Sequence, residues 1–155
     1  MPKSTQASIR SFLDARRIAV IGASRNPKDY SRVLLRALRT HGYETFPVNP
    51  SAEALDGQPC FHSVKEIRPA PERAVILLPE GPAEQAVVEC AEAGVTRLWL
   101  HARLGGAVDT RAVYRAEERG LELITGLCPF MFLPRAGFIH RLHGRVLKCL
   151  GAYPD

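Results

Sequence analysis

The sequence lacks any long run of apolar residues. None of its apolar runs approaches the roughly 18 residues that a membrane-spanning helix needs. Its first residues, Met1-Pro2-Lys3-Ser4-Thr5-Gln6, have no apolar core of the kind found in signal peptides. These two absences predict a cytoplasmic protein that contacts no membrane. With 155 residues, 46% of them hydrophobic and 24% charged, the chain is expected to form one globular domain with a substantial core.

The sequence also lacks closely spaced cysteines and long basic runs. Cys60, Cys90, Cys128 and Cys149 are widely separated and form no Cys-x-x-Cys pair. This spacing predicts reduced, mostly buried thiols rather than a disulfide framework or a zinc ribbon. The formal net charge is +5, but the lysines and arginines are scattered among acidic residues. The charge therefore suits a polyanionic small molecule better than a nucleic acid.

What the chain does contain is a regular alternation of apolar runs and helical patterns. Strands are expected at residues 17–22, 43–50, 74–79, 96–101 and 121–125. Helices are expected at 5–15, 31–41, 82–93 and 109–119, most of them ending at a glycine. This alternation predicts an α/β fold, a doubly wound (Rossmann-like) parallel five-stranded sheet with helices on both faces. We expect a leading helix in 1–16, the core in 17–128 and a C-terminal helical extension in 129–155.

The first strand ends on Gly22-Ala23-Ser24, just before a loop and a helix. A glycine here allows a tight turn and the close approach of a ligand, and the backbone N–H groups that follow can face an anion. Strand, glycine turn and helix start are the parts of a phosphate-binding βαβ unit. A single glycine also suits an ordinary strand-to-helix turn, so the pattern leaves both interpretations open.

The end of the second predicted strand argues against NAD. An NAD-binding unit places a carboxylate there to hold the ribose hydroxyls. This chain has Asn49-Pro50-Ser51 instead, and the nearest acid, Glu53, lies beyond the proline. The later two glycines of the dinucleotide fingerprint are missing as well. An NAD(H)-binding redox regulator therefore stays only as a weaker alternative.

Two stretches resemble a known family. Ile18-Ala19-Val20-Ile21-Gly22-Ala23-Ser24 and His41-Gly42-Tyr43-Glu44-Thr45-Phe46-Pro47-Val48-Asn49-Pro50 resemble the stand-alone CoA-binding proteins. That family is related to the N-terminal domain of the succinyl-CoA synthetase alpha subunit. The resemblance extends over residues 17–129, and it implies a Rossmann-like domain that holds coenzyme A (CoA) or an acyl-CoA across its strand ends.

The resemblance also implies which residues meet the ligand. Gly22, Ala23 and Ser24 would contact the pyrophosphate, and Asn49, Pro50 and Ser51 would flank the adenine and its ribose. Leu78 and Pro79 would pack on the pantetheine or another apolar portion, and Cys128 and Pro129 would close the edge at the fifth strand. Independently of the resemblance, the basic side chains near the first loop are suited to the 3′-phosphate and pyrophosphate: Arg25, Lys28 and Arg32.

The spacing of reactive side chains predicts no catalytic residues. The five histidines (His41, His62, His101, His140 and His143) form no recognisable nucleophile–base pair. The ligase relatives need a second domain with a phosphorylated histidine and a partner subunit, and the chain ends before such a domain could begin. We therefore expect a non-catalytic binding or regulatory module. The alternative is a component of an acyl-CoA-handling enzyme that works with another subunit.

Several further residues are expected to be structural. His41 ends a helix, and His101 and Trp99 are expected in or near the core. His140 and His143 share a helical face with Cys149 nearby, but two ligands at that spacing are a weak metal signal, and no metal is predicted. Cys128 is expected to be a buried thiol, the alternative being a thiol that exchanges with a CoA disulfide.

A homodimer or an unidentified protein partner is compatible with the sequence.

Overall fold

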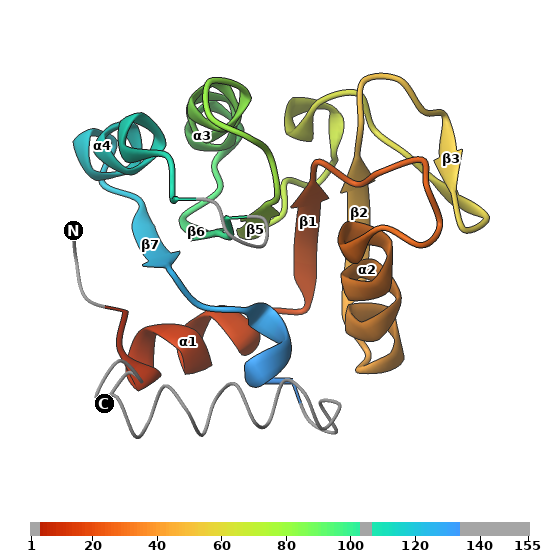
Figure 1. The fold of residues 1–155 in the computed structure, drawn as a ribbon, viewed down its shortest axis with the longest axis horizontal. Helices are drawn as coiled ribbons and strands as arrows, with labels where there is room; N and C mark the ends of the chain where they lie inside the picture. Colours follow the sequence, from red (N-terminus) through yellow and green to blue (C-terminus); the bar gives the residue numbers. More distant parts are fainter. Residues whose placement is uncertain (1–3, 103–106, 134–155) are drawn as a thin grey trace.

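A computed structural model describes residues 4–102 and 107–133. Its centre is a five-stranded parallel sheet with the strand order β2-β1-β5-β6-β7 (Figure 1). The strands are β1 (Arg17–Ile21), β2 (Glu44–Val48), β5 (Arg73–Ile76), β6 (Arg97–Leu100) and β7 (Glu122–Thr125). The predicted doubly wound parallel sheet is therefore confirmed, and every strand lies within its predicted range or begins one residue earlier.

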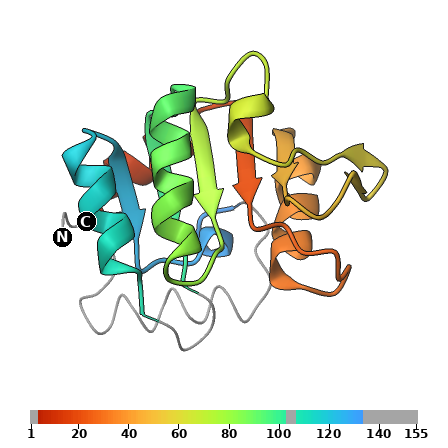
Figure 2. The same cartoon turned by 90° about the horizontal axis from the view of Figure 1, so that it is seen from above.

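Helices cover both faces of the sheet. One face packs against α3 (Pro82–Ala93), α4 (Thr110–Glu118) and the short η1 (Val64–Glu66). The opposite face packs against α1 (Gln6–Leu13), α2 (Tyr30–Thr40) and η2 (Pro129–Met131). The two helical layers are separated by the sheet in Figure 1, and Figure 2 shows the same arrangement from above. None of the helices among the described residues is long and apolar enough to span a membrane.

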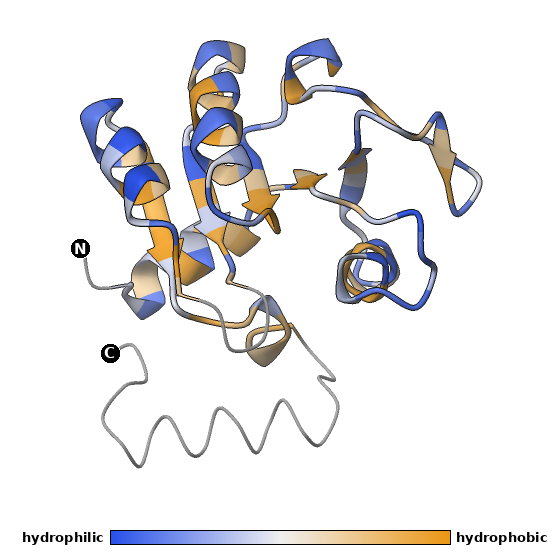
Figure 3. Ribbon diagram, turned by 45° about the horizontal axis from the view of Figure 1, so that its top comes forward, coloured by the Kyte–Doolittle hydropathy of each residue, from blue (hydrophilic) through white to orange (hydrophobic). Residues whose placement is uncertain are grey.

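The alternation of side chains along the strands explains their uninterrupted apolar sequence. In β1, Ile18 and Val20 point toward α1 and α2, whereas Ala19 and Ile21 point toward α3 and η1. Because both faces of a parallel sheet are covered, every position of the strand after the half-buried Arg17 is buried. The sheet is accordingly mostly orange in Figure 3, and the helices carry blue residues away from it.

Trp99 lies at the centre of the α1 face and is fully buried. Its ring meets Phe12 of α1 edge-on, with the ring centroids 5.3 Å apart. Its indole Nε1–H donates to the carbonyl of Leu127 at 2.9 Å, so the polar atom of the side chain is satisfied inside the core. The expectation that Trp99 belongs to the core is confirmed, and the leading helix packs on the sheet through it.

A small hairpin stands beside β2 at the end of the sheet (Figures 1 and 2). It consists of β3 (Ala54–Leu55) and β4 (Gln58–Pro59), which pair antiparallel. Asp56 and Gly57 between them both have positive φ angles, of 51° and 71°. Two such residues in a two-residue loop match the right-handed twist of the strands they join. The hairpin covers a small apolar cluster that includes Ala23 and Leu55.

The strand order places a topological switch point between β1 and β5. The chain leaves β1 toward β2 on one side, and after β2 it returns to β5 on the other side. The loops that follow β1 and β5 therefore diverge, and in doubly wound sheets ligands bind in the crevice between such loops. Here the crevice lies between the loop that follows Ile21 and the loop that follows Ile76.

Gly22 is the residue that lets these two loops approach each other. Its φ angle is +90°, a conformation that side-chain-bearing residues rarely adopt. A Cβ atom at Gly22 would lie 3.0 Å from both the Leu77 carbonyl oxygen and Leu78 Cδ2. Gly42 has a similar φ of +88° but nothing within 4 Å of its Cβ position. Only at Gly22, of these two glycines, do backbone conformation and close contact both require a missing side chain.

These two glycines form a matched test. We expect Gly22→Ala to lower the free energy of unfolding by about 2–4 kcal/mol, because backbone strain and overpacking add. Gly42→Ala carries the strain alone and is expected to cost about 1 kcal/mol. Urea unfolding of the two variants and the parent protein measures both values. Equal losses in the two variants would show that the contact with Leu77 and Leu78 contributes nothing.

Candidate functional site

The turn after β1 is held in place by the end of β2. The N–H groups of Gly22 and Ala23 both donate to the Val48 carbonyl, at 3.1 and 3.2 Å. The N–H of Ser24 donates to Ser31 Oγ at 2.9 Å. These are the three N–H groups that the sequence indicates as pyrophosphate donors, and each already has a partner in the protein. Their contact with a pyrophosphate stays a prediction that requires one of these bonds to be replaced.

Two polar groups of the same turn remain available. The Ser24 hydroxyl accepts a hydrogen bond from the Asn26 N–H at 3.1 Å, and its own proton meets no acceptor among the described residues. The N–H of Arg25 likewise has no acceptor within the described part of the chain. Ser24 is half-buried and Arg25 is exposed. The turn can therefore offer one hydroxyl and one backbone donor to an anion.

The start of α2 is connected to this turn. Asp29 caps the helix, because its carboxylate accepts from the Ser31 N–H at 2.9 Å and from the Ser31 hydroxyl at 2.6 Å. The Ser31 oxygen in turn accepts from the Ser24 N–H. Since Ser31 is almost completely buried, this chain of hydrogen bonds fixes the turn relative to the helix.

Arg32 joins three segments. Its side chain is only 5% exposed, and its Nε and Nη2 donate to the two carboxylate oxygens of Asp56, at 3.1 and 2.5 Å. Its Nη1 donates to the carbonyls of Ser24 and Arg25, at 3.0 and 3.3 Å. The guanidinium thus ties the turn after β1 to the hairpin. These contacts are those of a positioning residue, so the direct phosphate contact predicted for Arg32 stays a prediction that its geometry does not favour.

The contact with Arg32 changes the protonation equilibrium of Asp56. The hydrogen bonds from Arg32, followed by the charges of Arg32 and Arg36, hold the pKa of the Asp56 carboxyl below its usual value. Arg36 lies across the carboxylate from Arg32, with its Nη1 3.3 Å from Oδ2. The sequence does not mark Asp56 as a site residue, and no spacing rule connects it to Arg32. Its role in the site became visible only in three dimensions.

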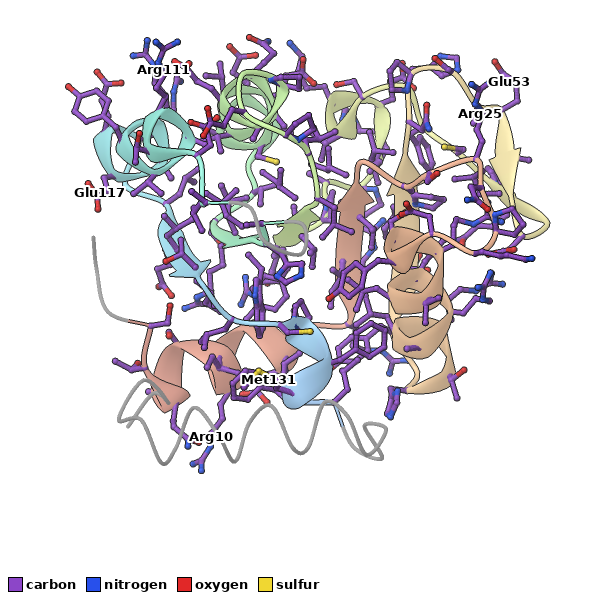
Figure 4. The ribbon with its side chains drawn as sticks, viewed as in Figure 1. Arg10, Arg25, Glu53, Arg111, Glu117 and Met131 are labelled. Atoms are coloured by element: carbon purple, nitrogen blue, oxygen red, sulfur yellow. The ribbon has the colours of Figure 1, made fainter. Side chains whose placement is uncertain are left out.

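Arg25 and Lys28 are the cations that remain. Both side chains are exposed, and neither makes an ion pair or hydrogen bond with another described residue. Figure 4 places Arg25 in the corner occupied by the hairpin, with Glu53 nearby. Unlike Arg32, these two side chains are available for an anionic ligand.

Asn49 connects the second strand to the turn after β1. Its Nδ2 donates to the Ala23 carbonyl at 2.8 Å, and its Oδ1 accepts from the Ser51 N–H at 2.7 Å. Pro50 and Ser51 next to it are exposed. The amide therefore shapes the rim, and it is the two residues after it that offer surface to a ligand.

An apolar cavity opens beside Leu78 and Pro79. Its volume is about 250 Å³, and it lies between the ends of β5 and β6 and the first turns of α3 and α4. Ile76, Leu100 and Ala112 form part of its wall. Leu78 is half-buried and Pro79 is exposed. The structure thus places these two predicted residues at the boundary between the switch point and a hollow.

Three side chains meet at the same edge of the sheet. The Tyr30 ring stacks on the His101 ring with 5.0 Å between the centroids. The Tyr30 hydroxyl lies 3.3 Å from Cys128 Sγ, so the half-buried thiol has a polar neighbour. Burial raises the pKa of Tyr30 well above its usual value, and the phenol stays protonated. Pro129, which follows Cys128, is buried and begins η2. Neither Tyr30 nor its contacts could be predicted from the sequence.

His101 is an uncharged member of this group. Its Nδ1 lies 3.2 Å from the Leu127 carbonyl, an acceptor, so Nδ1 carries the proton. Burial, the largest effect, lowers the pKa of His101. The other predicted structural histidine behaves as expected, since His41 Nδ1 lies 2.7 Å from the Ala37 carbonyl at the end of α2. His140, His143 and Cys149 lie outside the described residues. Within those residues, no group of three or more metal-ligating side chains is assembled.

Comparison with known proteins connects this geometry to a family. Over 85 residues the chain is 38% identical to subunit alpha of the ADP-forming acetate–CoA ligase II of Pyrococcus furiosus. The match covers 54% of this chain and 19% of that subunit, so the chain corresponds to about a fifth of that relative. It is 28% identical to the uncharacterized protein YneT of Bacillus subtilis, with 83% of this chain and 93% of YneT covered.

Solved structures and the family profile agree with these relatives. A hypothetical protein from Pyrococcus horikoshii superposes with a TM-score of 0.75 at 26% identity, and 93% of each chain is covered. The profile described as the CoA binding domain matches residues 16–134. That match spans the whole described sheet and both loops of the switch point. The chain therefore belongs to the CoA-binding domain family.

Proposed function

We propose that the chain binds CoA or an acyl-CoA at the carboxyl ends of β1, β2 and β5, as a non-catalytic binding or regulatory module. The observation that carries this proposal is the meeting of two different surfaces at Leu78. On one side lies a loop with two exposed cations that have no side-chain partner among the described residues, and on the other an apolar cavity. CoA has a matching division of charge, since its anionic phosphates lie toward one end of the molecule and the uncharged pantetheine forms the other end.

The anionic portion would lie on the turn after β1. The Ser24 hydroxyl and the Arg25 N–H can donate to the pyrophosphate, and Arg25 and Lys28 can neutralise the pyrophosphate and the 3′-phosphate. Gly22 lets the loop after β5 approach this turn, which brings Leu78 next to the proposed phosphate site. Arg32 would act on the ligand indirectly, by holding the Ser24 and Arg25 carbonyls in place.

The adenosine and the pantetheine would diverge from that turn. Pro50 and Ser51 present an exposed rim for the adenine and ribose, and the Asn49 amide holds this rim against the turn. In the other direction Leu78 and Pro79 offer an apolar path for the pantetheine. Cys128 and Pro129 would limit the site at the β7 end, where Tyr30 contacts Cys128 and stacks on His101.

A second function has support from one observation. Subunit alpha of an ADP-forming acetate–CoA ligase is 38% identical over 85 residues, and this chain spans only part of it. A component that acts together with another subunit is therefore the alternative to a free-standing module. The NAD(H) alternative is weaker, because the end of β2 carries the Asn49 amide instead of a carboxylate.

The ligand is tested by thermal unfolding of the protein with candidate nucleotides. At concentrations about 100-fold above the dissociation constant, a bound ligand adds about 2.7 kcal/mol, or about 5–10 °C in Tm for a chain of this size. We expect such a shift with CoA, and smaller shifts with dephospho-CoA, ATP and NAD at equal concentration. The difference between the Tm shifts with CoA and with dephospho-CoA measures the contribution of the 3′-phosphate to binding. Equal stabilisation by NAD would contradict the proposal.

The cationic loop is tested with two charge-matched double variants. We expect Arg25→Ser with Lys28→Ser to weaken CoA binding at least about tenfold, because each charge-assisted hydrogen bond is worth about 1.5–3 kcal/mol. The control, Arg10→Ser with Arg39→Ser, removes the same charge from α1 and from the far end of α2. Arg10 lies at the opposite end of the molecule from Arg25 in Figure 4.

Calorimetry at two salt concentrations separates local contact from net charge. The control variant is expected to bind within about twofold of the parent, because exposed charges beyond a Debye length of about 10 Å are screened. If both double variants lose affinity equally, the phosphates do not lie on the loop that carries Arg25 and Lys28.

A further inference from the structure

The size of the cavity beside Leu78 limits which part of a ligand can enter it. Known small-molecule sites have volumes of about 300–1,000 Å³, whereas this cavity measures about 250 Å³. The hollow is therefore too small for a whole nucleotide. A water molecule occupies about 30 Å³ in the liquid, so the space corresponds to roughly eight non-hydrogen atoms. It suits the end of a longer ligand.

The wall of the cavity selects an apolar end. Ile76, Leu78, Leu100, Ala83 and Ala112 contribute aliphatic surface from two strands, a loop and two helices. Ala83 and Ala112 are almost completely buried, and their small side chains leave the hollow open between α3 and α4. No lysine or arginine lines the described part of the cavity.

The charges that do line it disfavour an anion. Asp109 is 8% exposed, and its carboxylate accepts from the N–H groups of Arg111, Ala112 and Gly81, at 2.9, 3.3 and 3.1 Å. It thereby occupies three of the backbone donors at the starts of α3 and α4 that could otherwise bind an anion. Glu80 is exposed at the rim. A phosphate or carboxylate entering here would meet two like charges.

Leu78 connects the cavity with the proposed phosphate site. Its Cδ2 lies 3.0 Å from the position that a Cβ of Gly22 would occupy, and the same side chain lines the cavity. A ligand anchored by its phosphates near Ser24 and extended past Leu78 therefore has its far end directed toward the hollow. For CoA that far end is the thiol, or the acyl group of a thioester.

We infer that the cavity holds the acyl group of a short, uncharged acyl-CoA, with about two to six carbons. This inference rests on the proposed function, because the phosphates must first be anchored at the turn after β1. The thioester C, O and S atoms fill part of a space for roughly eight non-hydrogen atoms. The remaining space limits the number of carbon atoms in the acyl group. Glu80 and Asp109 exclude acyl groups that end in a carboxylate.

Calorimetric titration of the full chain with CoA, butyryl-CoA, decanoyl-CoA and succinyl-CoA tests the inference. We expect butyryl-CoA to bind about tenfold more tightly than CoA, since each buried methylene contributes up to about fourfold in affinity. Decanoyl-CoA and succinyl-CoA are expected to bind at least about tenfold more weakly than butyryl-CoA, the first because of its length and the second because of its charge.

Two variants locate the preference in the cavity. Ala83→Leu fills the hollow, and the ratio of butyryl-CoA to CoA affinity is expected to fall to about one. Ala93→Leu, at the half-buried last residue of the same helix and outside the cavity, is the matched control and should keep the ratio.

Glu80→Gln, at an exposed residue on the rim, tests the charge selection. It is expected to raise the affinity for succinyl-CoA relative to butyryl-CoA by several-fold, and it tests the site even if Ala83→Leu does not fold.

The outcomes distinguish this inference from the proposed function. If CoA and butyryl-CoA bind equally to the parent protein, or if Ala83→Leu keeps the preference, the acyl site is not this cavity, while CoA binding itself stands. If no CoA species binds, both proposals are wrong. An unchanged ratio of succinyl-CoA to butyryl-CoA affinity in Glu80→Gln would contradict the charge selection.

Discussion

The close approach of two backbone segments at the ends of β1 and β5 is the constraint on which the rest of this structure depends. Gly22 has no side chain at a place where a Cβ would lie 3.0 Å from the Leu77 carbonyl oxygen. Its N–H and that of Ala23 share the Val48 carbonyl, which fixes the turn to β2 as well. Three neighbouring strands thus end together around one residue, and the switch point of the sheet is closed at its base and open at its rim.

Around that turn the protein separates side chains that hold the site from side chains that are free to bind. The side chains that hold the site are engaged with one another or with backbone N–H and carbonyl groups of the turn: Arg32, Asp56, Ser31 and Asn49. A buried arginine without Asp56 would be an uncompensated charge, so the hairpin that carries Asp56 is as necessary as the helix that carries Arg32. This frame leaves the exposed Arg25 and Lys28 side chains without a partner in the described part of the chain, and these are the groups that we propose for the anionic portion of the ligand.

Charge is also divided along the edge of the sheet. Cations lie on the loop after β1, whereas Glu80 and Asp109 lie around the apolar cavity between β5 and β6. A ligand with one charged and one uncharged end can bind such an edge in only one direction. This division of charge is compatible with the CoA-binding domain family, to which the chain belongs.

The sequence by itself determined the architecture, because apolar runs that are buried on both faces, each followed by an amphipathic helix, have few ways to pack. It also indicated the turn at Gly22, the rim at Asn49 and the path at Leu78, since residues that follow parallel strands share one edge. The family resemblance agreed with the profile match over residues 16–134. Strand and helix limits were predictable to within a few residues.

Only the tertiary structure decided which basic residue is free and where the hollow lies. Arg25, Lys28 and Arg32 look alike in sequence, yet only Arg32 reaches Asp56, a residue 24 positions further along. Tyr30 meets Cys128 across 98 positions, and Glu80 and Asp109 come together only because α3 and α4 start side by side. The periodicity of apolar residues indicates which face of a helix or strand is buried. The partners of charged and polar side chains depend instead on how separate elements pack, and residues that are far apart in the sequence leave no local pattern that reveals their contact.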